Sequence, residues 1–163
     1  MKKYKWILIL INLILLLGLS TNSILKKEKL LSDGQLILLE LAPVDPRSLL
    51  QGDYMRLRYA ISNTSRNDHV VFKRGFCVVK LDAMGIAQKV RIQENSTPLN
   101  ENEFLINFTS KKWNGINIGA ESFFFQEGEG EKYEKAKFGG LKVDLNGNSL
   151  LIGLYDENLQ KIE

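Results

Sequence analysis

The sequence predicts a mainly β domain, either an antiparallel sandwich or an open barrel with one short helix, preceded by an N-terminal transmembrane helix. Three observations lead to this fold class. A run of leucine and isoleucine begins after a few basic residues at the N-terminus. The rest of the chain holds short apolar runs with alternating polar residues, which are typical of strands. Turn signals built from Asp and Gly separate several of these runs, as in antiparallel all-β architectures.

Residues 1–25 are predicted to be a membrane anchor or a signal segment. Three lysines lie within the first five residues, and residues 6–19 are apolar except for Asn12. A basic start followed by an apolar run is typical of a secretory signal. Residues 6–25 supply the roughly 20 mostly apolar positions with which an uncleaved anchor crosses the hydrocarbon core. Gly18 and Ser20 form a weak cleavage pattern, so a cleaved signal is the alternative, and in both cases the following domain is exported.

Residues 26–34 are expected to be a juxtamembrane linker, either a short helix or a spacer. The three lysines in this segment balance the three that precede the apolar run, so charge does not set the orientation of the anchor. The exported domain is expected to occupy residues 35–163, which is enough chain to bury a core without disulfides. The one cysteine, Cys77, lies between apolar neighbours and is expected to be a small buried hydrophobe.

Four runs predict strands outside the hairpins described next. Residues 35–41 are apolar and too few for a helix. In residues 54–61, Met55, Leu57, Tyr59 and Ile61 fall on one face, and Tyr54, Arg56 and Arg58 fall on the other. Period two with one polar side predicts a half-buried antiparallel strand. Residues 104–109 and 116–125 predict two more strands, and the three phenylalanines that end the second suit a core with one exposed ring.

Two hairpins of one design are predicted. Residues 76–81 lead into a turn from Asp82 to Gly85, and the chain returns through residues 86–92. The second hairpin pairs residues 141–143 with 150–155 around a turn from Asp144 to Gly147. In each turn the Asp side chain accepts a hydrogen bond from the backbone ahead of it, and the Gly adopts a positive φ. We therefore interpret both segments as turns and not as metal-binding loops.

One helix is expected after the strands, at residues 130–138. Tyr133, Ala136 and Lys137 have helical spacing there. Acidic residues at its start suit the positive end of the helix dipole. Gly139 and Gly140 are expected to end it.

Composition excludes several classes of function. A net charge of +3, part of it from the N-terminal lysines, is too small to indicate nucleic acid binding. One histidine and one cysteine exclude a histidine-rich or cysteine-based metal cage. We predict no metal, no cofactor and no nucleic acid partner. Because we identify no catalytic residue, the sequence favours a protein that is not an enzyme. It does not set the oligomeric state.

The densest motif lies in residues 43–59. Gly52, Asp53 and Tyr54, followed by Leu57 and Tyr59, spell the motif of the GDYXXLXY proteins, a bacterial family. Segments before this motif, at residues 125–136 and in the final hairpin also match, so the chain resembles the family over nearly the whole exported domain. The resemblance implies a single-pass protein of the bacterial inner membrane, with its domain facing the periplasm or the exterior. It also implies a link to polytopic membrane proteins, and it assigns no catalytic residues.

The candidate binding residues come from this motif and the loop before it. They are Asp45, Arg47, Gly52, Asp53, Tyr54, Arg56, Leu57, Arg58 and Tyr59. Arg47 and Asp53 flank the loop and are expected to pair across it, and Asp45 and Asp53 are expected at the mouth of the groove described next. In a functional interpretation Tyr54, Arg56 and Arg58 line a surface groove, because two arginines on one face suit a carboxylate or a phosphate, including lipid headgroups near the tether. In the alternative, the arginines lie over the sheet and Tyr54 packs at its edge.

Three functions follow from these residues. We expect an accessory domain that is attached to the membrane through residues 6–25 and docks on an integral membrane protein. The first alternative is a small binding module for an anionic ligand, recognised by Arg56 and Arg58. The second is a degenerate signal-peptidase-like β domain, because residues 46–57 are similar to a strand of those enzymes. A Ser/Lys site needs an activated serine, but Pro43 stands at the expected nucleophile position, and Ser48 and Lys73 are weak substitutes.

Overall fold

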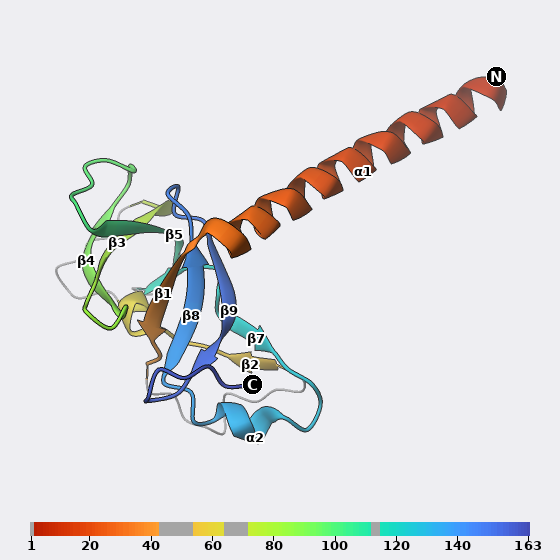
Figure 1. The fold of residues 1–163 in the computed structure, drawn as a ribbon. Coiled ribbons are helices and arrows are strands. Elements are labelled where there is room, and N and C mark those ends of the chain that lie inside the picture. Colours follow the sequence, from red (N-terminus) through yellow and green to blue (C-terminus); the bar gives the residue numbers. More distant parts are fainter. Residues whose placement is uncertain (1, 43–53, 64–71, 112–114) are drawn as a thin grey trace.

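The computed structural model describes residues 2–42, 54–63, 72–111 and 115–163, which form one long helix, nine strands and two short helical turns. Helix α1 (Lys2–Asp33) is 32 residues long and projects from the β domain as a single straight rod (Figure 1). From Tyr4 onward all of its side chains are exposed except that of Leu30, which is half-buried. The helix continues without a break through residues 26–33, so the segment expected to be a linker is itself helical.

A three-stranded antiparallel sheet receives the chain directly from α1. It contains β1 (Gln35–Glu40), β8 (Phe138–Val143) and β9 (Ser149–Tyr155) in the order β1-β8-β9. The apolar residues of β1 are enclosed, and Ile37 and Leu39 have no exposed surface. Helix α1 contacts β8 and β9.

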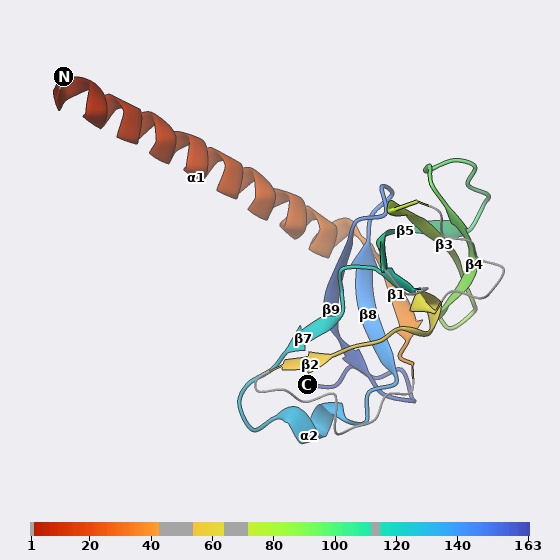
Figure 2. The same cartoon turned by 180° about the vertical axis from the view of Figure 1, so that it is seen from behind.

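A four-stranded antiparallel sheet lies beside the first. Its strands are β3 (Arg74–Leu81), β4 (Ala87–Gln93), β5 (Glu103–Lys111) and β6 (Gly115–Asn117), in the order β4-β3-β5-β6. A separate pair is formed by β2 (Tyr54–Arg56) and β7 (Ser122–Phe124). Figure 2 shows this pair on the flank of the domain toward which α1 projects.

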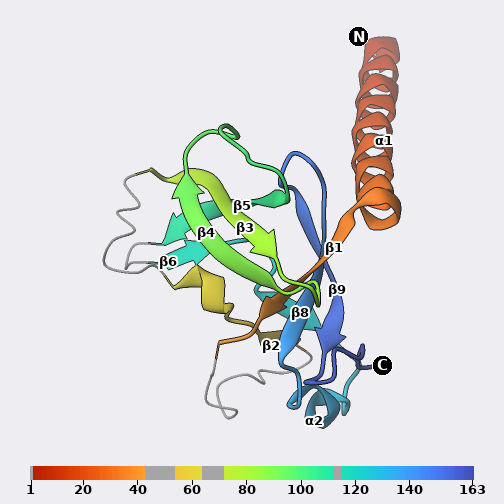
Figure 3. The ribbon, with the colours of Figure 1, turned by 60° about the vertical axis from the view of Figure 1, so that its left-hand side comes forward.

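The two larger sheets curve around one core and form a half-barrel (Figure 3). Leu38 of β1 bridges Ile86 beside β4, and the Asn107 backbone N–H of β5 donates to the carbonyl of Gly147, at 2.9 Å. Fully buried side chains from both sheets meet inside, among them Cys77 and Leu154. The prediction of a mainly β domain behind an apolar helix is confirmed, and the curvature matches the open barrel of the two predicted forms.

Both predicted hairpin turns have the expected hydrogen bonds. The Asp82 carboxylate accepts from the N–H groups of Met84 and Ile86, at 2.8 and 2.9 Å, and Gly85 has a φ of +80°. The turn after Asp144 repeats this arrangement, with Gly147 also at +80°. A third turn of the same kind follows β9, but Leu159 takes the glycine position with a φ of +60°. Because no glycine marks it, the sequence did not reveal this turn.

Three sequence predictions were wrong in extent. The strand expected at residues 54–61 is regular only in β2, and its end lies in a short 3-10 helix, η2 (Ala60–Ser62). Helix α2 covers only Gly130–Tyr133, and Gly139 and Gly140 do not end a helix but lie inside β8. The rings of Tyr59 and Tyr155 occupy the space where β-carbons at these glycines would lie, so the sheet needs glycine there. The strand predicted at residues 116–125 is split into β6 and β7 at Gly119, whose φ is +81°.

Candidate functional site

The motif segment at residues 54–61 has two faces, as its alternation predicts. Met55, Leu57, Tyr59 and Ile61 are all at most 6% exposed and belong to the core. Arg56 and Arg58 are exposed, and Tyr54 is half-buried. Regular pairing with β7 covers only the first three residues of the segment, and an isolated bridge then joins Tyr59 to Leu41. Within the motif, Leu57 and Tyr59 therefore serve packing, and the alternate residues face outward.

Tyr59 anchors the motif in the core. Its ring is fully buried and lies against Gly139, where an added β-carbon would be 2.8 Å from a ring atom. Its hydroxyl donates a buried hydrogen bond of 2.7 Å to the carbonyl of Ala120. Burial, and then the nearby charge of Glu121, raise the pKa of the Tyr59 hydroxyl well above its ordinary value. The side chain is therefore neutral and acts as a donor that ties the motif to the segment before β7.

Aromatic side chains on β7 divide between the same two faces. Phe124 is 72% exposed and lies beside its cross-strand partner Tyr54, with ring centroids 5.7 Å apart. Phe123 and Phe125 are partly buried and contact Tyr133 of α2, at centroid distances of 4.9 and 5.6 Å. This is the predicted arrangement of core rings with one exposed ring. The exposed ring continues the outer face of the motif strand.

A groove of about 370 Å³ lies beside this face, between α1 and the domain. We call it the helix groove. It is lined by Lys27, Gly119, Ala120, Ser122, Phe123, Phe124, Ser149, Leu150 and Leu151. Arg56 does not line it directly, but Arg56 is the cross-strand partner of Ser122, so the two side chains are neighbours on one face. The groove thus has a mixed polar and apolar lining, with one lysine on α1 and an arginine at its border.

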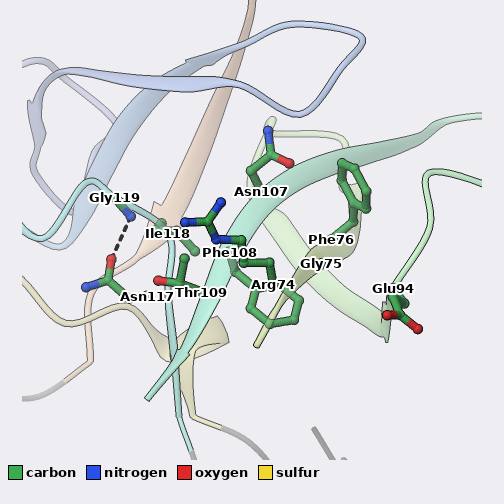
Figure 4. A pocket seen from close by; sticks show the side chains of 10 residues that line it. All are labelled: Arg74, Gly75, Phe76, Glu94, Asn107, Phe108, Thr109, Asn117, Ile118 and Gly119. Atoms are coloured by element: carbon green, nitrogen blue, oxygen red, sulfur yellow. Dashed lines mark hydrogen bonds between the residues drawn. The ribbon is translucent and has the colours of Figure 1, made fainter. Parts of the chain in front are cut away.

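A second groove, of about 460 Å³, lies on the outer face of the four-stranded sheet (Figure 4). Arg74, Thr109 and Asn117 are successive partners across β3, β5 and β6, so their side chains form one polar row. The Arg74 guanidinium is exposed and makes no hydrogen bond or ion pair within the part of the chain that the structure describes. The Asn117 carbonyl oxygen accepts from the N–H of Gly119, at 2.8 Å, which leaves its amide N–H₂ available. We call this the arginine groove; sequence patterns did not predict it because its row comes from three separate strands.

The shortest described ion pair serves structure. Arg91 makes a two-point contact with Glu103, at 2.7 and 2.8 Å, and it also donates to the carbonyl of Pro98, at 2.8 Å. The backbone N–H of Asn100 donates to the same carboxylate, at 2.9 Å. The hydrogen bonds from Arg91, and then that from Asn100, lower the pKa of Glu103 to about 2. The pair fastens the loop between β4 and β5 to both strands.

Several predicted residues lie outside the residues that the structure describes. They are Asp45, Arg47, Ser48, Gly52 and Asp53. Lys73 is described and is exposed, so it lacks the desolvation that a catalytic lysine base requires. The described ranges contain no group of three or more His, Cys, Asp or Glu side chains placed to hold a metal ion.

Comparisons with known proteins address the identity of the chain. No curated protein and no solved structure matches it. The model of one family, described as GDYXXLXY protein, matches residues 16–154. The match covers the end of α1, the motif and all nine described strands except the last residue of β9. The chain therefore belongs to the GDYXXLXY protein family.

Proposed function

We propose that this protein is a membrane-tethered domain that docks on an integral membrane protein. In this proposal α1 crosses the cytoplasmic membrane of a bacterium once and holds the β domain on the outer side. Support comes from the aliphatic surface of α1. The rest of the described chain buries none of its apolar stretch. Such a surface needs lipid or another protein around it.

The observation that carries the proposal is the direct join between α1 and the sheet. Only Gly34 separates the end of the helix at Asp33 from the start of β1 at Gln35. The N–H of Gly34 donates to the carbonyl of Leu30, at 3.0 Å, and the Lys142 ammonium donates to the carbonyl of Gly34, at 2.8 Å. A β-carbon at Gly34 would collide with the Leu30 carbonyl. A join without a free linker fixes one face of the domain toward the membrane, as docking on a neighbouring membrane protein requires.

Insertions into α1 test this orientation directly. Two alanines placed between Glu28 and Lys29 turn the domain by about 200° about the helix axis. Four alanines turn it by about 400°, so the domain ends only about 40° from its original orientation. We expect mild crosslinking in native membranes to recover a stoichiometric membrane protein with the wild type. The four-alanine variant should retain much of this product, and the two-alanine variant should lose it.

Recovery of the wild-type protein alone, without a stoichiometric partner, would count against docking. Equal recovery from both insertion variants would show that the orientation of the domain does not matter. Membrane flotation of each variant serves as the control, because both insertions leave the apolar stretch at residues 6–25 unchanged.

A second candidate function is recognition of a small anion in the arginine groove. The free Arg74 guanidinium, the Thr109 hydroxyl and the Asn117 amide offer several donors to one carboxylate or phosphate. Glu94 also lines the groove, and Figure 4 shows its side chain apart from that of Arg74. This placement favours a ligand with an anionic end that meets Arg74.

Thermal shift with inorganic phosphate and with succinate tests this second function. We expect either probe to raise the melting temperature of the wild type and of Lys73→Ala, and to have no effect on Arg74→Ala. Lys73 is the matched control because it is an exposed cation next to Arg74 that does not line the groove. Shifts of equal size in all three proteins would contradict this candidate.

A further inference from the structure

The helix groove lies where the tether leaves the domain. Lys27 on α1 is one side of it, Ser122 and Phe124 of β7 form another, and the start of β9 completes the lining. Figures 1 and 2 show α1 rising from one end of the β1-β8-β9 sheet, with β7 further down the domain beside β9. The groove therefore lies between α1 and the β domain.

The length of α1 sets the level of this groove relative to a bilayer. Residues 6–25 of the helix span about 30 Å, which equals the thickness of the hydrocarbon core. Lys27 comes two residues later, or about 3 Å further along the axis, and so falls within the headgroup layer. The end of the helix at Asp33 is about 9 Å beyond Lys27. The groove beside Lys27 is thus held within reach of the lipid headgroups.

The charged residue in the described lining of the groove is a cation, and the nearby Glu121 carboxylate accepts a hydrogen bond from the N–H of Ile118, at 2.7 Å. Among the described residues that line the groove, Lys27 is the only charged one, and Arg56 lies at its border as the cross-strand partner of Ser122. Neither cation forms an ion pair within the described ranges. Phe124 also lines the groove, and its side chain is 72% exposed. Two cations that form no ion pair among the described residues, beside the exposed ring of Phe124, match an amphipathic anion better than a simple one.

We propose that the helix groove binds an anionic phospholipid from the leaflet through which α1 emerges. The Lys27 ammonium and the Arg56 guanidinium hold the phosphate, and the glycerol and the first methylenes of an acyl chain lie on Phe124 and Leu150. This inference rests on the proposed membrane tether, because only a tethered domain meets the headgroups at this level. The bound lipid fixes the face that the domain turns toward its membrane partner.

Hydrogen exchange on the full-length protein in nanodiscs tests the site. One set of nanodiscs contains only phosphatidylcholine, and the other also contains phosphatidylglycerol. We expect the anionic lipid to slow exchange severalfold in residues 119–124 and 149–151 of the wild type. Lys27→Gln and Arg56→Gln should lose this protection. Lys29→Gln should retain it, because Lys29 lies about 200° around the helix from Lys27 and does not line the groove.

The outcomes separate the lipid site from the tether. Failure of the wild type to enter phosphatidylcholine nanodiscs would overturn the tether and the lipid site together. Entry without protection by phosphatidylglycerol would overturn the lipid site alone. Equal loss of protection in Lys27→Gln and Lys29→Gln would replace the site by a general attraction between a basic helix end and an anionic surface. Full protection by soluble glycerol phosphate in phosphatidylcholine nanodiscs would identify a free phosphate site instead of a lipid site.

Discussion

Substitution of Tyr59 by phenylalanine removes one hydroxyl from the core and keeps the ring. The lost hydrogen bond, 2.7 Å long, leaves the buried carbonyl of Ala120 without this donor. A buried acceptor left unpaired costs about 1–3 kcal/mol, and the hydroxyl's own desolvation offsets a part, so we expect a loss of about 1.5–2 kcal/mol in the free energy of unfolding. Tyr59→Ala, which also leaves a cavity, should cost about 3–5 kcal/mol.

Urea unfolding of the full-length protein in detergent micelles, followed by near-ultraviolet circular dichroism, measures this change. At an m-value of about 1–3 kcal/mol/M, the midpoint of Tyr59→Phe should fall by roughly 0.5–2 M. Tyr54→Phe is the matched control, because Tyr54 belongs to the same motif but its hydroxyl makes no hydrogen bond within the described residues and its ring is half-buried. Midpoints that agree for the two variants would refute the structural role of the Tyr59 hydroxyl.

The pH dependence supplies an independent check on the same hydroxyl. The pKa of Tyr59 is raised in the folded protein from its ordinary value of 10.0. Above pH 10 the unfolded chain therefore loses a proton that the folded chain keeps, and the stability contributed by this group falls as the pH rises. Each pH unit above 10 should narrow the gap between the wild type and Tyr59→Phe by about 1.4 kcal/mol. A gap that stays constant up to pH 11 would contradict burial of the hydroxyl.

Two further predictions concern the turns and the fastened loop. Gly85→Ala should lower the free energy of unfolding by about 1 kcal/mol, because a φ of +80° is the only constraint on that glycine. Gly147→Ala should lower it by about 2 kcal/mol or more, because the new β-carbon would also lie 3.2 Å from the β-carbon of Leu105. Equal urea midpoints for the two variants would show that packing at Gly147 is unimportant. Because the pKa of Glu103 is lowered to about 2, its contribution to stability is fully present above pH 4.5 and is lost as the pH falls toward 2. Hydrogen exchange in residues 94–102, corrected for intrinsic rates, should become faster as the pH falls toward 2 in the wild type but not in Glu103→Gln. If exchange depends on pH in the same way in both proteins, the contact between Arg91 and Glu103 is not the cause of the acid-induced loss of stability.

Local sequence patterns predicted much of this fold because local physics decides those parts. Side chains in a strand alternate between faces, so the spacing of Met55, Leu57 and Tyr59 was sufficient to place them in the core. Asp and Gly at fixed positions likewise predicted both hairpin turns, since the required hydrogen bonds and positive φ lie within five residues. The apolar N-terminal run also predicted the long helix, although not its continuation to Asp33.

Distant contacts account for what the sequence did not reveal. Gly139 and Gly140 resemble a helix stop, and only their packing against the rings of Tyr59 and Tyr155 explains why they lie in a strand. The two grooves have the same origin, because their lining residues come from segments that pair across the sheets. A single sequence does not give strand order, so the polar row of Arg74, Thr109 and Asn117 across three strands was not predictable.

The two faces of the motif separate folding from the proposed function. Leu57 and Tyr59 point into the core, so substitutions there mainly lower the stability of the fold. Tyr54 and Arg56 face outward and pair with Phe124 and Ser122, which are both part of the helix groove lining. Because a surface substitution away from buried contacts usually changes stability by less than about 0.5 kcal/mol, variants of this outer face should fold normally. If those variants lose membrane docking or lipid contact, the cause is then the changed surface that the motif presents beside the tether, and not a damaged fold.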